Sequence, residues 1–60
     1  MKFRELEKII KDDGWQYIGT KGSHHHYKHP TKPGKVTIPF HNTDLKIKTA
    51  NSTLKQAGLK

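Results

Sequence analysis

Apolar residues recur along the chain with two different spacings. Over residues 2–12 they fall at positions 3, 6, 9 and 10, the spacing of one face of a helix, and charged side chains fill most other positions. Gly14 follows, and glycine commonly ends a helix in the left-handed conformation. The pattern predicts a short amphipathic helix at the start of the chain.

Three later segments have the composition of strands. Residues 15–20 are rich in aromatic and β-branched side chains, and residues 24–29 follow a Gly-Ser pair. A segment with two prolines and a glycine, residues 30–34, separates these from residues 35–38, where polar and apolar residues alternate. Short connections between successive strands predict an antiparallel meander.

The end of the chain predicts a second helix. Residues 41–48 read as an irregular connector, Thr49 is a suitable N-cap, and the helix runs to about Ala57 with Gly58 as its stop. The apolar stripe of this helix is thin and consists of Ala50, Leu54 and Ala57.

The predicted fold class is therefore α+β, with the order α-β-β-β-α. Two helices cover one face of a small three-stranded antiparallel sheet and leave the other face open. Sixty residues are expected to form a single domain, residues 1–60. A core is expected from apolar residues in periodic segments: Phe3, Leu6, Ile9, Ile10, Trp15, Tyr17, Ile18, Tyr27, Val36, Ile38, Leu45, Leu54 and Leu59.

Composition limits the class of protein further. The absence of cysteine excludes disulfides and thiolate metal sites. No apolar run is as long as a signal-peptide core or a membrane span, so we expect a cytoplasmic protein with no membrane partner.

The net charge of +7 is unevenly distributed. Residues 1–20 carry four basic and four acidic side chains, whereas residues 21–60 carry eight lysines against Asp44 alone. A surface with this excess of positive charge favours a polyanion such as nucleic acid, or an acidic protein, as its partner. Solubility alone is the alternative explanation.

Four of the five histidines fall within residues 24–29, inside this basic part of the chain. Histidine exchanges protons near neutral pH, so a cluster on a basic surface favours catalysis. Strand alternation places His25 with Tyr27 on one face and His24 with His26 on the other. If Tyr27 packs under the helices, His25 must lie at the rim of the sheet, through a bulge or a late strand start.

The order of these motifs resembles that of the HicA family of bacterial toxins, over essentially the whole chain. The residues that carry the resemblance are Glu5-Leu6, Asp13-Gly14-Trp15, Lys21-Gly22-Ser23-His24-His25, His29-Pro30, Val36-Thr37-Ile38-Pro39, His41 and Leu54-Lys55-Gln56-Ala57-Gly58-Leu59. The chain departs from the usual pattern at Phe3, where a small polar residue is common, and at Lys48, Ala50 and Thr53.

The resemblance implies a fold similar to the double-stranded RNA-binding domain and an mRNA interferase that cleaves mRNA and inhibits growth. It implies a HicB-type antitoxin as the protein partner and no cofactor. In that family the histidine that closes Gly-Ser-x-His carries activity, and the matching residue here is His25.

RNA cleavage without a metal needs a base for the 2′-hydroxyl proton, positive charge at the phosphate and an acid for the leaving oxygen. His25 is the candidate acid–base group, and Ser23 is a candidate to orient its imidazole. The RNA-binding candidates are Lys21, Gly22, Lys28 and Lys35. The second acid–base group stays open among His24, His29 and His41.

Two other classes of function stay open. A metal site could use His24 and His26 with His29 or His41, although no motif with metal-ligand spacing is present. A non-catalytic RNA-binding module of the same fold would keep the lysines and make His25 dispensable. Trp15 and Tyr27 are expected in the core rather than as stacking platforms for bases.

Overall fold

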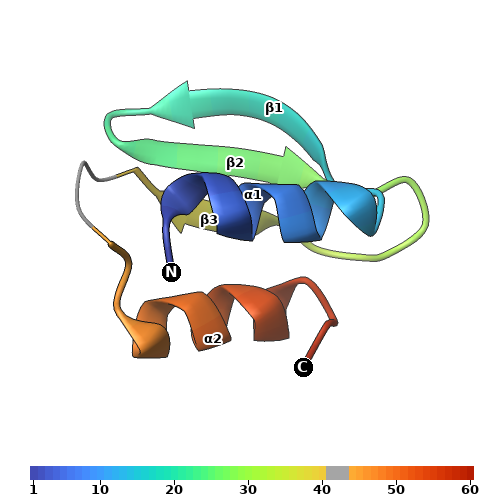
Figure 1. Cartoon of the computed structure of the whole chain (residues 1–60). Helices are drawn as coiled ribbons and strands as arrows, with labels where there is room; N and C mark the ends of the chain where they lie inside the picture. The colour runs from blue at the N-terminus through green and yellow to red at the C-terminus, as the bar shows by residue number, and fades with distance from the viewer. Residues whose placement is uncertain (41–43) are drawn as a thin grey trace.

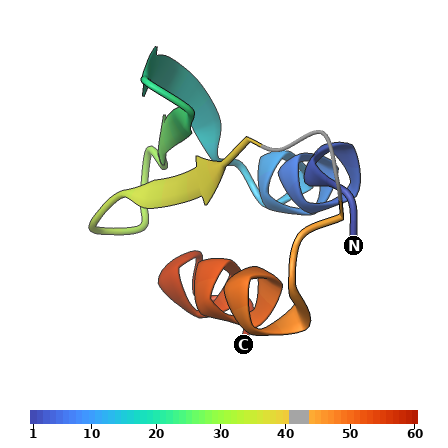
Figure 2. The same ribbon diagram turned by 90° about the vertical axis from the view of Figure 1, so that its left-hand side faces the viewer.

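The computed structural model describes residues 1–40 and 44–60 (Figure 1). Three strands form one antiparallel sheet in the order β1-β2-β3, and both helices lie on the same side of it (Figure 2). The elements are α1 (Phe3–Asp12), β1 (Gln16–Lys21), β2 (His24–Lys28), β3 (Val36–Pro39) and α2 (Ile47–Gln56). The predicted α+β fold and the α-β-β-β-α order are confirmed, and each strand boundary lies within one residue of its predicted position.

The hairpin between β1 and β2 brings the Gly-Ser pair to the end of the sheet. Lys21 pairs with His24, so the connection has two residues, Gly22 and Ser23. Gly22 has φ +61°, in the left-handed region that glycine occupies without steric cost. A glycine at the first central position suits a two-residue hairpin that matches the twist of its strands.

The pairing of β1 with β2 is interrupted once. The register shifts between Tyr17 and Gly19, so Ile18 has no partner on β2. A bulge of this kind bends the strand and strengthens its twist. β1 is the edge strand furthest from β3, and it is the strand that carries the bulge.

The buried core lies between the helices and the sheet. It consists of Phe3, Leu6, Ile10, Trp15, Tyr27, Val36, Ile38, Leu45, Ala50 and Ala57, with Leu54 packed at its margin. The prediction was wrong for Ile9, Tyr17, Ile18 and Leu59, which are all exposed. For Tyr17 the reason is its strand, because the helices pack against β3 and leave the β1 edge uncovered.

The start of α2 differs from the prediction. Thr49 is not its N-cap; the cap is Lys46, with no side-chain hydrogen bond, and the helix begins at Ile47. The residue before the cap, Leu45, is buried, and its backbone N–H donates to the Met1 carbonyl at 2.7 Å. Tertiary anchoring at Leu45 therefore decides where the helix begins, against the local preference for a threonine cap.

The buried side of α2 is made of small residues. Ala50, Thr53 and Ala57 are buried, whereas Leu54 is only partly covered. Small side chains allow a helix to approach a strand closely, and the Gln56 side-chain oxygen accepts a hydrogen bond from the backbone N–H of Thr37 at 3.2 Å. α2 is thus fixed to the edge strand β3 by a polar contact as well as by packing.

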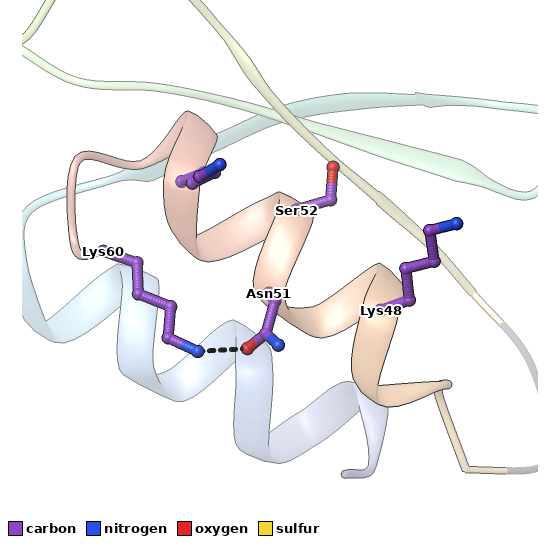
Figure 3. A pocket seen from close by; sticks show the side chains of 5 residues that line it. Lys48, Asn51, Ser52 and Lys60 are labelled. Atoms are coloured by element: carbon purple, nitrogen blue, oxygen red, sulfur yellow. Dashed lines mark hydrogen bonds between the residues drawn. The ribbon is translucent and has the colours of Figure 1, made fainter.

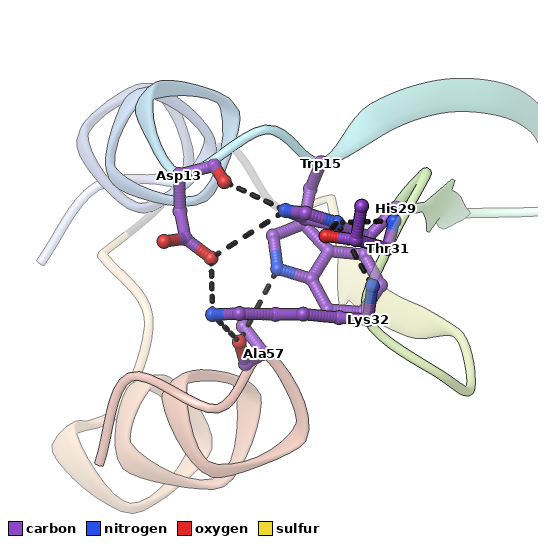
Figure 4. A network of polar contacts seen from close by, with 6 residues as sticks. All are labelled: Asp13, Trp15, His29, Thr31, Lys32 and Ala57. Carbon is purple, nitrogen blue, oxygen red and sulfur yellow. Dashed lines mark hydrogen bonds and ion pairs between the residues drawn. The ribbon is translucent and has the colours of Figure 1, made fainter.

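A lysine in the β2–β3 loop joins the ends of both helices (Figure 4). The Lys32 ammonium forms an ion pair with the Asp13 carboxylate and donates to the Ala57 carbonyl at 3.0 Å. The Trp15 indole N–H donates to the same carbonyl at 3.3 Å. The hydrogen bond and charge of Lys32 hold the pKa of Asp13 below its usual value.

Neither helix, among the residues described, has the length and apolar character needed to cross a membrane.

Candidate active site

His25 lies on the helix-facing side of β2, in a cluster of aromatic rings. Its imidazole meets the Phe3 ring edge-on at a centroid distance of 4.8 Å. The rings of Phe40 and Tyr17 lie 5.5 and 5.6 Å from it. His25 is the second residue of β2, close to the hairpin, and it is only partly buried, whereas Tyr27 on the same face is completely buried. This position fits the expectation that His25 lies at the rim of the sheet.

The two nitrogens of His25 differ in their surroundings. Nδ1 is buried and has no hydrogen-bond partner among the residues that the structure describes. The imidazole is therefore held by packing against rings and not by an orienting hydrogen bond. Because Nδ1 is enclosed, Nε2 is the nitrogen through which this ring can reach groups outside the cluster.

The other predicted site residues lie mostly on the opposite face of the sheet. His24 pairs with Lys21 and with Pro39, and paired residues of an antiparallel sheet share a face. Alternation along β2 puts His26 and Lys28 on this same face, which no helix covers (Figure 2). The sheet thus separates His24 from His25, although they are neighbours in sequence.

His26 lies among positive charges on this open face. Its Nδ1 lies 3.1 Å from the Thr37 hydroxyl on β3. Partial burial lowers the pKa of His26, and the charges of Lys35 and Lys21 lower it further. Both lysines therefore lie close enough to His26 to act on it, so the open face gathers Lys21, Lys28 and Lys35 with the two imidazoles. We call these five residues the open-face basic cluster.

The Gly22-Ser23 turn lies between these two groups of residues. Both residues are exposed, and the Ser23 carbonyl accepts a hydrogen bond from the backbone N–H of Phe40 at 2.7 Å. This bond ties the hairpin to Phe40, one of the rings beside His25. No hydrogen bond joins the Ser23 side chain to His25 in the described part of the chain, so the orienting role remains a hypothesis.

His29 has a structural position. Its Nε2 donates to the Asp13 carbonyl at 2.7 Å, and its Nδ1 accepts the backbone N–H groups of Thr31 and Lys32 at 3.0 and 3.1 Å (Figure 4). The ring packs edge-on against Trp15, 5.3 Å away. Both nitrogens are thus engaged in shaping the β2–β3 loop, and His29 does not share a site with His25.

Two expectations remain, namely a second acid–base group and a metal site. His41 lies outside the described residues. Within residues 1–40 and 44–60, no three histidine, aspartate or glutamate side chains are grouped closely enough to hold a metal ion.

A comparison with known families decides the class of protein. A family model described as "HicA toxin of bacterial toxin-antitoxin" matches residues 3–59, nearly the whole chain. The chain belongs to the HicA toxin family. It is therefore the toxin of a toxin–antitoxin pair and has a cognate antitoxin as partner, in agreement with the resemblance stated above. No curated protein matches the chain.

Sequence reasoning missed two of the rings that surround His25 in this HicA toxin. Tyr17 was assigned to the core, and Phe40 was not considered, yet both are about half exposed. The Tyr17 hydroxyl also forms a hydrogen bond with that of Thr20, the β1 residue paired with His25. The available signal was Phe3, already noted as a departure from the family pattern, since the Phe3 ring contacts both His25 and Phe40.

The HicA toxin has a further basic region on α2, outside the predicted site. A shallow depression there is lined by Lys48, Asn51, Ser52, Lys55 and Lys60, and the Lys60 ammonium donates to the Asn51 side chain (Figure 3). None of its residues belongs to the histidine-bearing strand.

Proposed function

We propose that this toxin is a metal-independent endoribonuclease that cleaves mRNA with His25 as its principal acid–base residue. The observation that carries the proposal is the placement of His25. It is a partly exposed imidazole with one nitrogen enclosed, held by three aromatic rings at the rim of a strongly basic sheet. The family membership supports toxin activity and thereby favours the catalytic reading of this histidine.

The chemistry assigns one transfer to His25. Nε2 takes the proton of a ribose 2′-hydroxyl, and the resulting oxygen attacks the adjacent phosphorus. The bond from phosphorus to the 5′ oxygen breaks, and that oxygen leaves with a proton from an acid or from water. The products are a 2′,3′-cyclic phosphate and a 5′-hydroxyl end, and no oxidant, reductant or metal is needed. A positioned acid–base group of this kind typically contributes about 10²- to 10⁴-fold in rate.

The three lysines of the open-face basic cluster are assigned to binding RNA and not to the chemical step. Lys21, Lys28 and Lys35 neutralise phosphates, and such contacts position nucleic acid without reading its sequence. Lys21 pairs with His24 beside the hairpin, directly after Thr20, the partner of His25. An RNA strand that passes around the hairpin end would meet both His25 and this cluster.

The cognate antitoxin is proposed to be of the HicB type and to act on the same surface. A partner that covers His25 and offsets the net charge of +7 would stop both RNA binding and cleavage. The toxin is proposed to act in the cytoplasm of its host. Expression of the toxin alone is expected to arrest growth of the host, and co-expression of the antitoxin is expected to restore growth.

The test is cleavage of a labelled single-stranded RNA by the purified chain in EDTA. Wild type, His25→Ala and His24→Ala are compared, and circular dichroism checks that each is folded. His24 is the matched control because it is an exposed imidazole on the opposite face. We expect wild type and His24→Ala to cut and His25→Ala to bind RNA without cutting. Binding without cutting by wild type would support the non-catalytic RNA-binding module instead.

A further inference from the structure

The exposed aromatic surface of this chain is gathered at His25. The sequence has five phenylalanine, tyrosine and tryptophan residues, and Trp15, Tyr27 and Phe3 are at most 9% exposed. The other two, Tyr17 and Phe40, are 49% and 46% exposed. Both lie within 5.6 Å of the His25 ring, measured between centroids. Every half-exposed aromatic ring in the chain therefore borders the proposed reactive imidazole.

Packing alone does not account for this arrangement. A chain of 60 residues has few large apolar side chains and buries a comparatively small fraction of its surface. Because two of the five aromatic rings are half exposed, the domain buries less apolar surface in its core than it could. Exposed apolar side chains that are grouped together, rather than scattered singly over the surface, are typical of binding sites.

The chemistry of the patch fits a nucleotide strand. Across the patch an aromatic ring, the His25 imidazole and a second aromatic ring follow one another. This order matches that of a base, a phosphate and a second base along an RNA strand. Nucleobases stack on aromatic side chains whatever their sequence, because every base has a π face. A purely apolar protein segment would instead cover the His25 imidazole without offering it a hydrogen bond, which is unfavourable.

The same argument selects the form of the RNA. In an A-form duplex the bases are stacked on one another and their faces are not available to a protein ring. The paired strand positions on the open face of the sheet carry no phenylalanine, tyrosine or tryptophan, and the only rings among them are the imidazoles of His24 and His26 and the saturated ring of Pro39. The phenol and phenyl rings on which two neighbouring bases could stack are therefore found beside His25 and not at the paired positions of the open face.

We propose that Tyr17 and Phe40 stack the bases on either side of the phosphate held at His25, so that the toxin acts on unpaired RNA. The inference rests on the proposed ribonuclease function and specifies its substrate as a strand with at least two unstacked bases. Tyr17 and Phe40 are positioning residues, because they contact bases and not the reacting atoms.

The test measures binding separately from cleavage. Short 2′-O-methyl oligonucleotides lack the attacking hydroxyl, so the wild-type chain binds them without cutting. Affinity is measured for an intact single strand and for a duplex of the same sequence. It is also measured for single strands that lack one or the other of the two bases proposed to stack. The variants are Tyr17→Leu and Phe40→Leu. Tyr17→Phe and Phe40→Trp keep a ring, and Ile18→Ala is the control for loss of an exposed apolar side chain next to the site.

We expect Tyr17→Leu and Phe40→Leu each to weaken binding of the intact strand by about tenfold or more. An abasic substitution at the matching position should weaken wild-type binding similarly and should weaken that leucine variant little further. Tyr17→Phe, Phe40→Trp and Ile18→Ala should bind like wild type, and the duplex should bind more weakly than the strand.

The inference is overturned if the leucine variants lose equal affinity for intact and abasic strands, or if the duplex binds as tightly as the strand. Loss of antitoxin binding with RNA binding unchanged would also overturn it and would assign the two rings to the protein partner. Cleavage of unmodified RNA by wild type, run in parallel, separates the two proposals. One outcome is that wild type cleaves RNA while the leucine variants and the abasic strands show no coupling in binding free energy. In that case the inference about base stacking fails and the proposed ribonuclease function stands.

Discussion

The imidazole of His25 meets the ring of Phe3 edge-on, with their centroids 4.8 Å apart. Phe3 begins α1 and His25 lies on β2, so this contact couples the orientation of the histidine to the packing of the first helix. Since no hydrogen bond to a described residue holds the buried Nδ1 of His25, the surrounding rings alone set the direction of Nε2.

Phe3→Leu should therefore reduce cleavage more than RNA binding. The smaller side chain leaves space beside the imidazole, and a displacement of about 1 Å can cost on the order of 100-fold in rate. The loss in stability should be about 1–2 kcal/mol, because a buried ring is exchanged for a smaller apolar group. Single-turnover cleavage, RNA affinity and urea unfolding of the same preparations check this. An unchanged cleavage rate would show that Phe3 does not position His25.

A second contact, between Gly14 and His29, governs stability at the other end of the sheet. Gly14 has φ +110°, and a Cβ on it would lie 2.6 Å from His29 Nε2. Gly14→Ala should lower the free energy of unfolding by about 2–4 kcal/mol, from backbone strain and displacement of the ring. Gly34→Ala is the matched control, since Gly34 has φ +84° but open space around it, and it should cost only about 1 kcal/mol. Equal losses in urea titrations would mean that the His29 contact contributes nothing.

The Asp13–Lys32 ion pair predicts a pH dependence of stability. Lys32 lowers the pKa of Asp13, so the stability from this pair is present above pH 4 and is lost as pH falls through the lowered pKa. Lys32→Met should be less stable than wild type at pH 7, and the difference should narrow below pH 4. Thermal unfolding of both chains from pH 7 to pH 2 measures it. A constant difference across this range would assign the effect to the Ala57 hydrogen bond alone.

His26 should titrate below the ordinary histidine range. Burial and the charges of Lys35 and Lys21 lower its pKa, so the group is neutral at pH 7 and stability falls as pH drops below about 6.5. An NMR titration of the histidine ring protons tests the value directly. Lys35→Gln should move the His26 titration upward, and a His26 midpoint at or above 6.5 in wild type would contradict the description of the open face.

The open-face lysines should determine how RNA binding depends on salt. Lys28→Gln and Lys35→Gln should each reduce the slope of log affinity against log salt by about 0.7, the value for one phosphate contact on a single strand. Lys8→Gln on α1 is the control, because Lys8 already pairs with Asp12. Unchanged slopes for Lys28→Gln and Lys35→Gln would place the RNA elsewhere, and the basic depression on α2 would be the next surface to test.

The sequence predicted the elements well because each has a strong local signal. The helical spacing of Phe3, Leu6 and Ile10 and the break between two strands at Gly22-Ser23 depend on neighbours in the chain, and both are confirmed. The start of α2 was wrong because Leu45 is anchored by Met1, a contact between residues 44 positions apart. No local rule for caps contains that information.

The candidate site was only partly predictable for a similar reason. Strand alternation correctly placed His25 on the face of Tyr27 and His24 on the other. It could not show that Tyr17 stays exposed, because this follows from two helices that leave the β1 edge of the sheet uncovered. Nor could it show that His29 uses both nitrogens to hold the β2–β3 loop.

Chemical rescue of His25→Ala by free imidazole tests whether the His25 side chain carries out the proton transfer. The single-turnover cleavage rate of one labelled RNA is measured in EDTA, with and without imidazole, for wild type, His25→Ala and His24→Ala. The proposed role predicts that His25→Ala loses at least about 100-fold in rate and that imidazole restores part of it, with no effect on the other two chains. Cleavage by His25→Ala at the wild-type rate would contradict the assignment of His25 as the principal acid–base residue.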